Sequence, residues 1–107
     1  MVINSRSKGC RGELELAAFL KLHGLEARRG QQFKGGGDSP DVVCDDLANI
    51  HIECKRVEQG NPYLWLEQAK RDAGEKVPVV AHRRNRHDWI AILSLTDLLK
   101  LLGHDDW

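Results

Sequence analysis

The sequence predicts an α/β fold in which a central mixed β-sheet of about five strands is flanked by helices. Short runs rich in Val and Ile, bounded by Gly, Pro, Asn and Asp, recur along the chain and are typical of strands. Segments rich in helix-forming residues alternate with these runs, and the predicted order is α-β-β-β-α-β-β-α. The 107 residues suffice for one hydrophobic core, so a single domain, residues 1–107, is expected.

The first helix is predicted over about Gly12 to His23, because this stretch is rich in strong helix formers. Its apolar residues recur at the spacing of one helix face, and Gly24 suits the end of a helix. The preceding residues 5–11 are expected to be flexible and basic. Glu13 and Glu15 would then lie in the first turns, where acidic groups favour the helix dipole, although one of them could also reach a metal.

A first strand is predicted over Leu25–Phe33, and a glycine-rich loop, residues 34–39, leads to Pro40. Three glycines would let the backbone come close to a ligand. Because no Gly-Lys-Ser/Thr follows, the loop is not interpreted as a nucleotide-binding loop. Asp38 is considered as a metal ligand but lies in the loop.

A β-hairpin is predicted from Val42–Cys44 and Ile50–Cys54, which flank the polar segment 45–49. Strand side chains alternate between the two faces of a sheet, so Glu53 and Lys55 should lie on one face. If Asp41 pairs across the hairpin near Glu53, two carboxylates and one ammonium group converge.

The second half of the chain continues with a helix over Pro62–Gly74, capped by Asn61 with Pro62 at its first position. Leu64, Ala69 and either Leu66 or Trp65 are expected to be partly buried there, and core packing is the default for Tyr63 and Trp65. Strands over Val77–Ala81 and Trp89–Leu93 enclose a basic turn, residues 82–87. Ser94 or Thr96 should cap a short helix that runs through Leu102 and ends at Gly103.

The carboxylates of the hairpin suggest metal chemistry. Mg²⁺ prefers oxygen ligands and needs only one or two carboxylates together with water and phosphate oxygens. Such an ion can activate a water and offset the charge of a phosphate, while Lys55 could orient that water. A half-buried hairpin with charges on its solvent face would carry the same residues, and the hairpin alone does not decide between these interpretations.

The charges are unevenly distributed although the formal net charge is zero. Residues 1–34 contain seven Lys or Arg against three Asp or Glu, residues 35–55 contain one against five, and residues 56–107 contain eight against eight. An acidic middle between basic flanks fits a metal site within a phosphate-binding surface, but it also fits ordinary charge balancing.

Further sequence features bear on the location of the protein and on other kinds of metal site. No apolar run approaches a membrane span and the N-terminus does not resemble a secretory signal. The three cysteines are interpreted as reduced, which favours a cytoplasmic location. The histidines lack metal-ligand spacing, so a His/Cys metal protein is not favoured; they are His23, His51, His82, His87 and His104.

Pro40-Asp41 followed by Glu53-Cys54-Lys55 resembles the signature of the PD-(D/E)XK nuclease superfamily. The chain is more specifically similar to the small archaeal-type Holliday junction resolvases and their phage-encoded relatives. The likeness covers nearly the whole chain and includes Lys8-Gly9, Glu13 on a helix, a glutamine on the helix after the hairpin, Pro78–Ala81, the basic turn and Trp89.

This resemblance implies Mg²⁺-dependent hydrolysis of DNA phosphodiester bonds, with Mn²⁺ able to substitute, by a homodimer that nicks four-way junctions. By position, Glu13, Asp41 and Glu53 would bind the metal, Lys55 would position or help to activate the attacking water, and Gln68 would be an auxiliary polar residue. The expected contacts to the phosphate backbone are Arg6, Lys8, Arg11, Arg29, Lys34, Arg83, Arg84 and Arg86. No membrane partner and no organic cofactor are expected.

The chain also departs from the resolvase pattern. Its loop before Pro40 is longer. A serine is expected near the catalytic aspartate, and the sequence leaves open whether Ser39 takes that role. The acidic Asp45-Asp46 turn and the zero net charge differ from a strongly basic resolvase. A less selective nickase or flap nuclease therefore stays open, as does a non-catalytic DNA-binding protein. The short chain argues against a restriction enzyme with a separate recognition domain.

Overall fold

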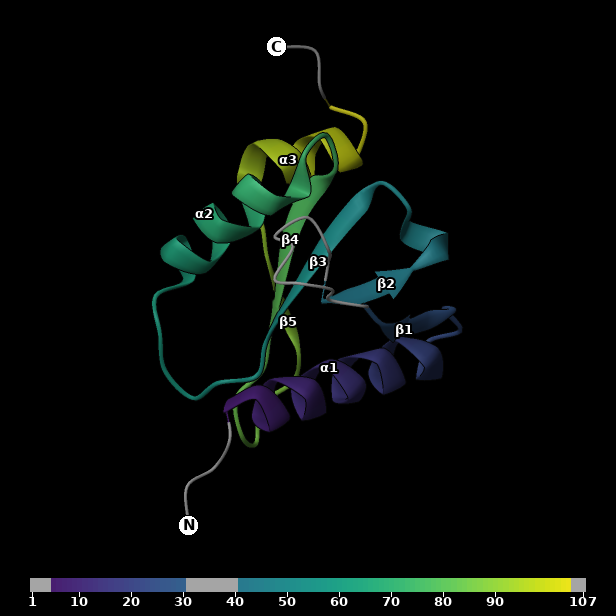
Figure 1. Ribbon diagram of the computed structural model, residues 1–107. Helices are drawn as coiled ribbons and strands as arrows, with labels where there is room; N and C mark the ends of the chain where they lie inside the picture. The colour runs from purple at the N-terminus through teal and green to yellow at the C-terminus, as the bar shows by residue number, and fades with distance from the viewer. Residues whose placement is uncertain (1–4, 31–40, 105–107) are drawn as a thin grey trace.

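The computed structural model describes residues 5–30 and 41–104, and the side chains of the first helix from Cys10 onward. Within these residues, a five-stranded mixed sheet is flanked by three helices (Figure 1). The elements follow the order α-β-β-β-α-β-β-α, which confirms the predicted fold class.

The strands lie side by side in the order in which they occur along the chain. They are β1 (Ala27–Arg29), β2 (Val42–Cys44), β3 (Ile50–Lys55), β4 (Val77–His82) and β5 (Ile90–Ile92). The pairs β1–β2, β2–β3 and β4–β5 are antiparallel, and a 3₁₀ turn (Asp45–Leu47) connects β2 to β3. Strands β3 and β4 are parallel because the helix α2 (Pro62–Ala73) forms the crossover between them.

The first helix, α1, spans Ser5–Leu22, so the prediction of a flexible segment up to Arg11 was wrong. Glu13 and Glu15 consequently lie in the helix interior rather than in its first turns. Gly12, predicted at the start of the helix, lies in its interior and permits close packing. A Cβ atom at this position would lie 2.7 Å from Arg56 Cβ, a contact that forces one of the two elements to move.

The end of α1 follows the prediction. Gly24 adopts φ +83°, its N–H donates to the carbonyl of Lys21, and the N–H of Leu25 donates to the carbonyl of Leu20. These two bonds form a Schellman motif. The strand predicted over Leu25–Phe33 is shorter than expected, because β1 covers only Ala27–Arg29 and residues 31–33 lie outside the described part.

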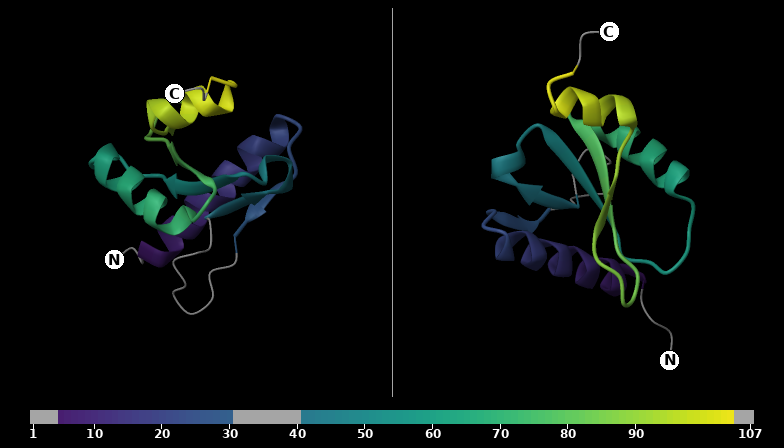
Figure 2. Two further views of the ribbon diagram at one scale, coloured as in Figure 1. Left: turned by 90° about the horizontal axis from the view of Figure 1, so that it is seen from above. Right: turned by 180° about the vertical axis from the view of Figure 1, so that it is seen from behind.

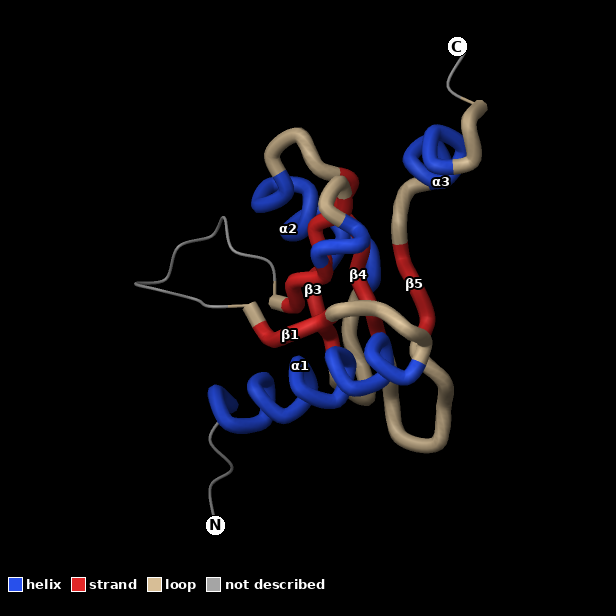
Figure 3. The backbone as a smooth tube through the Cα atoms, turned by 90° about the vertical axis from the view of Figure 1, so that its right-hand side faces the viewer, coloured by secondary structure: helices blue, strands red, loops and turns tan. Residues whose placement is uncertain are grey.

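Two different layers cover the two faces of the sheet. The core against α1 consists of buried side chains, namely Leu16, Ala17, Ala27, Val42, Cys44 and Ile52. In β3, His51 and Glu53 are the neighbours of Ile52, so their side chains point to the opposite face. On that face α2 packs over β3 and β4 through Ala69. Figures 2 and 3 show α2 and α3 (Leu95–Leu101) on opposite sides of the sheet.

Both later helices begin as predicted. Asn61 Oδ1 accepts a hydrogen bond from the N–H of Tyr63, and Ser94 Oγ accepts one from the N–H of Asp97. The expected burial of α2 was partly wrong, since Tyr63 and Leu64 are 80% and 59% exposed. Ala69 and Ala73 are buried, Trp65 and Leu66 are partly buried as expected, and the Trp65 ring packs against His82 of β4. No helix of residues 5–30 and 41–104 combines the length and apolarity needed to cross a bilayer.

Candidate active site

The two carboxylates of the hairpin lie side by side on one face of the sheet. Val42 is paired with Ile52 in the antiparallel ladder, and the N–H of Asp41 donates to the Ile52 carbonyl at 2.9 Å. This register places Asp41 opposite Glu53. Asp41 is anchored by Oδ2, which accepts a hydrogen bond of 2.8 Å from the N–H of Cys54. The two carboxylates that the sequence predicts to converge therefore lie next to each other in the fold.

The pKa of Asp41 reflects its proximity to Glu53. Burial and then the charge of Glu53 raise the pKa of Asp41 from 3.8 to about 7, against the opposing effect of the Cys54 N–H. A hydrogen bond with Glu53 and the charge of Glu13 raise it further. Burial and the charge of Asp41 also raise the pKa of the Cys54 thiol to about 12. The two carboxylates thus repel each other in a site that holds them together.

Glu53 contacts a buried histidine that was not among the predicted site residues. His51 Nε2 lies 2.7 Å from Glu53 Oε1, and the two residues are only 1% and 7% exposed. The signal was present, because residues two apart in a strand share a face. Spacing rules for metal-binding histidines could not find it, since His51 contacts the carboxylate rather than occupying a ligand position of its own.

Glu13 reaches the site from α1. Its Oε1 accepts a hydrogen bond of 2.7 Å from Arg29 Nε, and Glu13 is 8% exposed. This contact raises the pKa of Arg29. Glu13 contributes to the raised pKa of Asp41, but it is the smallest of the causes named above. It is therefore close to the Asp41–Glu53 pair, while its own carboxylate is engaged by Arg29.

Lys55 and Gln68 occupy different environments. Lys55 ends β3 two residues after Glu53, is partly buried, and is paired with His82 in the parallel ladder. It therefore shares the face of Glu53. Gln68 lies on α2 with an exposed side chain. The fold brings Asp41, Glu53 and Lys55 together, with Glu13 nearby, and leaves Gln68 on the surface of the helix that covers this face.

These side chains fit a hard divalent cation. Mg²⁺ needs only one or two carboxylates, with water or phosphate oxygens completing its coordination. A cation between Asp41 and Glu53 would relieve the repulsion that raises the pKa of Asp41. Among residues 5–30 and 41–104, no group of three or more His, Cys, Asp or Glu side chains is ready to hold one ion. The fit therefore rests on the Asp41–Glu53 pair, with Glu13 close by.

The basic residues expected to contact DNA divide into several groups. Arg11, Arg84 and Arg86 are exposed, whereas Arg29 and Arg83 are paired with Glu13 and Glu15. The side chains of Arg6 and Lys8, and the whole of Lys34, lie outside the described residues, as do Asp38 and Ser39. Contact of the eight basic residues with phosphate stays a prediction.

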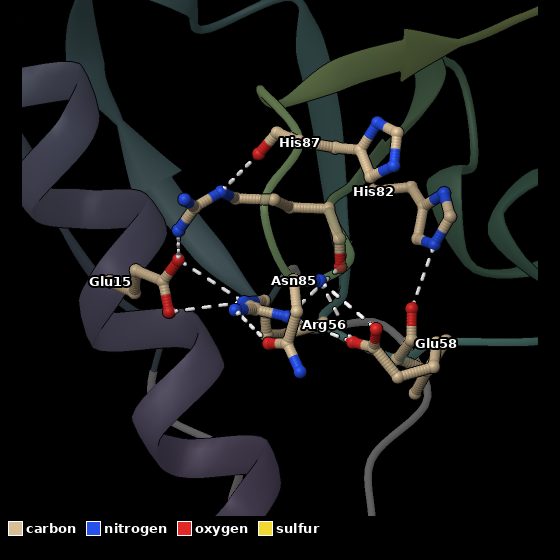
Figure 4. Close-up of polar contacts among 8 residues, drawn as sticks. Glu15, Arg56, Glu58, His82, Asn85 and His87 are labelled. Atoms are coloured by element: carbon tan, nitrogen blue, oxygen red, sulfur yellow. Dashed lines mark hydrogen bonds and ion pairs between the residues drawn. The ribbon is translucent and has the colours of Figure 1, made fainter.

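A polar network centred on Arg56 fixes the turn between β4 and β5 to the end of β3 (Figure 4). Arg56 Nε donates to both carboxylate oxygens of Glu15 at 3.1 and 3.2 Å, and Nη2 donates to Asn85 Oδ1 at 3.0 Å. Glu58 accepts hydrogen bonds from the N–H of Asn85 at 3.0 and 3.1 Å. Arg83 donates to Glu15 and to the carbonyl of His87. Glu15, predicted only as a helix-dipole residue or metal ligand, therefore helps to order this turn.

Comparison with known proteins supplies a family. No curated protein and no solved structure matches the chain. One family model does, over residues 4–105, and its description is "Phage putative PDDEXK endonuclease". This match spans nearly the whole chain, including Asp41, Glu53 and Lys55 in the Pro-Asp…Glu-x-Lys pattern. The chain belongs to this phage family of PDDEXK endonucleases.

Proposed function

We propose that this protein is a divalent-metal-dependent endonuclease that hydrolyses phosphodiester bonds in DNA. The observation that carries the proposal is the position of the half-buried Asp41 opposite the buried Glu53 in the ladder, where the charge of Glu53 helps to raise the pKa of Asp41 to about 7. Two carboxylates in such repulsion favour a cation between them, and Lys55 shares their face. Membership of an endonuclease family supports the same chemistry.

In this proposal each side chain has a defined task. Asp41 and Glu53 bind the ion, for which we propose Mg²⁺ with Mn²⁺ as a substitute, and Glu13 serves as a third carboxylate. The bound ion would offset charge on the scissile phosphate and acidify a water. Lys55 places a positive charge beside the attacking water and the phosphate. Gln68 is proposed only as an auxiliary polar residue, because its side chain is exposed on α2.

The proposed substrate is a four-way DNA junction cut by a homodimer. A branched DNA shape is recognised by two backbone-binding surfaces related by a two-fold axis, without base readout. Self-association is supported by apolar side chains that are exposed on α3 and at its end, namely Leu95, Leu98, Leu101 and Leu102. Sedimentation of wild type and Leu102→Glu tests this: a dimer that the variant disrupts is expected, and a monomeric wild type overturns the homodimer.

The decisive experiment compares three substrates of matched sequence, a four-way junction with a mobile core, a nicked flap and a linear duplex, each with Mg²⁺. Glu53→Ala is the blank, because it removes one carboxylate of the pair. Paired symmetric nicks in the junction alone are expected. Equal cutting of all three substrates would retain the endonuclease but overturn junction selectivity. Tight binding without cutting would favour a non-catalytic DNA-binding protein instead.

A further inference from the structure

A surface depression lies at the turn between β4 and β5, apart from the carboxylate pair. Its volume is about 250 Å³, and its lining consists of His82, Arg83, Arg84, His87, Asp88 and Ile90. Two of these residues are arginines and two are histidines, against a single carboxylate. The chemistry of this lining favours an anion.

The depression opens on the same face of the sheet as the candidate active site. Lys55 is paired with His82 in the ladder between β3 and β4, and His82 is paired with Ile90 between β4 and β5. Paired residues of neighbouring strands point to the same face. Lys55, His82 and Ile90 therefore form a row across the sheet, and β5 lies about 10 Å from β3, which is two strand spacings.

The charges around the depression are not equivalent. Arg83 donates to Glu15 and to the carbonyl of His87, so its guanidinium is already engaged. A hydrogen bond of 3.0 Å joins His82 Nε2 to the carbonyl of Val57, which orients that ring. Arg84 is exposed and forms no ion pair with any described side chain. Of the two arginines that line the depression, Arg84 is thus the one that can bind an anionic ligand without breaking an ion pair.

The hydrogen bonds of Arg56 and Glu58 hold the backbone on both sides of Arg84 in place. Arg56 is hydrogen-bonded to Asn85 Oδ1 and to the carbonyl of Arg83, and Glu58 accepts from the N–H of Asn85. The residues on both sides of Arg84 are therefore fixed to the end of β3 before any ligand binds (Figure 4). An ordered backbone reduces the entropy lost on binding.

We propose that this depression binds one backbone phosphate of the DNA strand beside the scissile phosphate, with Arg84 as the charged ligand and His87 at the rim. The proposal rests on the proposed nuclease function and defines how its substrate is held. A guanidinium group matches a phosphate with two parallel hydrogen bonds.

The first test measures DNA binding in EDTA, where cleavage does not interfere. Fluorescence anisotropy of a labelled duplex is recorded against salt concentration for wild type, Arg84→Gln and Arg28→Gln. Arg28 is a matched control, because it is an exposed arginine on the distant strand β1 and is paired with Asp45. Loss of one phosphate contact should lower the slope of log K against log salt by about 0.9 for Arg84→Gln only. Equal slopes for the two variants would overturn the site.

A second test identifies the phosphate. Single methylphosphonate groups, which carry no charge, replace successive phosphates along one strand. One substitution should weaken binding of wild type and leave binding of Arg84→Gln unchanged, because both changes remove the same contact. Additive losses at every position would refute the pairing. Neither binding test needs cleavage, so a wild type that cuts no substrate refutes the nuclease, whereas cleavage with unaltered Arg84→Gln binding refutes only the phosphate site.

Discussion

Replacing Asp41 by asparagine should stabilise the fold at alkaline pH while it removes the proposed metal site. The pKa of Asp41 is raised from 3.8 to about 7, chiefly by burial and by the charge of Glu53. A shift of this size corresponds to about 4 kcal/mol of cost for the ionised carboxylate in the folded protein. Asparagine is nearly isosteric, lacks the charge, and can still accept the hydrogen bond from the Cys54 N–H.

The sign of the effect depends on pH. Below pH 3.8, Asp41 is protonated in both the folded and the unfolded chain, so its raised pKa has no destabilising effect. As the pH rises to about 7, the unfolded chain ionises first and the folded protein loses stability. Asp41→Asn should therefore exceed wild type by about 2–4 kcal/mol at pH 9, and the difference should shrink as the solution is acidified.

Urea denaturation at pH 5, 7 and 9 in EDTA measures this difference. Asp45→Asn is the control, because Asp45 is an exposed carboxylate of the same hairpin and forms only a surface ion pair with Arg28. Adding Mg²⁺ at 100 times its Kd should stabilise wild type by about 2.7 kcal/mol and leave Asp41→Asn unchanged. An Asp41→Asn protein that is no more stable than wild type at pH 9 would refute the coupling between the two carboxylates.

Three further predictions test the site and its support. Glu53→Ala and Lys55→Ala should each abolish cleavage of DNA while gel-shift binding survives, and cleavage by both variants would remove the assignment of the site. His51→Phe should weaken Mn²⁺ binding in calorimetry about 10- to 100-fold, because Glu53 loses the partner that orients it, and His51→Gln should recover part of the loss. Gly12→Ala should lower the free energy of unfolding by about 1–3 kcal/mol in urea, since its Cβ would lie 2.7 Å from Arg56 Cβ; a gain in stability, as expected for an ordinary helical glycine, would contradict this close packing.

Local patterns predicted most of the elements. The caps formed by Asn61 and Ser94, and the glycine at the end of α1, are short-range devices that sequence alone reveals. The start of α1 was missed because Gly9 and Gly12 disfavour a helix in isolation. Packing of α1 against β3 outweighs that preference, and it also explains why a glycine is present at the contact with Arg56.

Burial of individual side chains was harder to predict. The amphipathic pattern of α2 suggested that Leu64 would be partly buried, yet Leu64 is 59% exposed, whereas Ala69 and Ala73 are buried. Periodicity indicates which residues share a helix face, but how far the face is covered depends on the strands beneath it. Tyr63 stays exposed for the same reason.

The sequence by itself determined the fold class, the hairpin and the face shared by Glu53 and Lys55, because strand alternation and turn residues act over a few positions. Only the tertiary structure decided which partners the charged groups have. It placed Asp41 opposite Glu53 and paired Arg83 with Glu15, 68 residues away along the chain. Such contacts depend on the register and packing of separate elements, which no local pattern encodes.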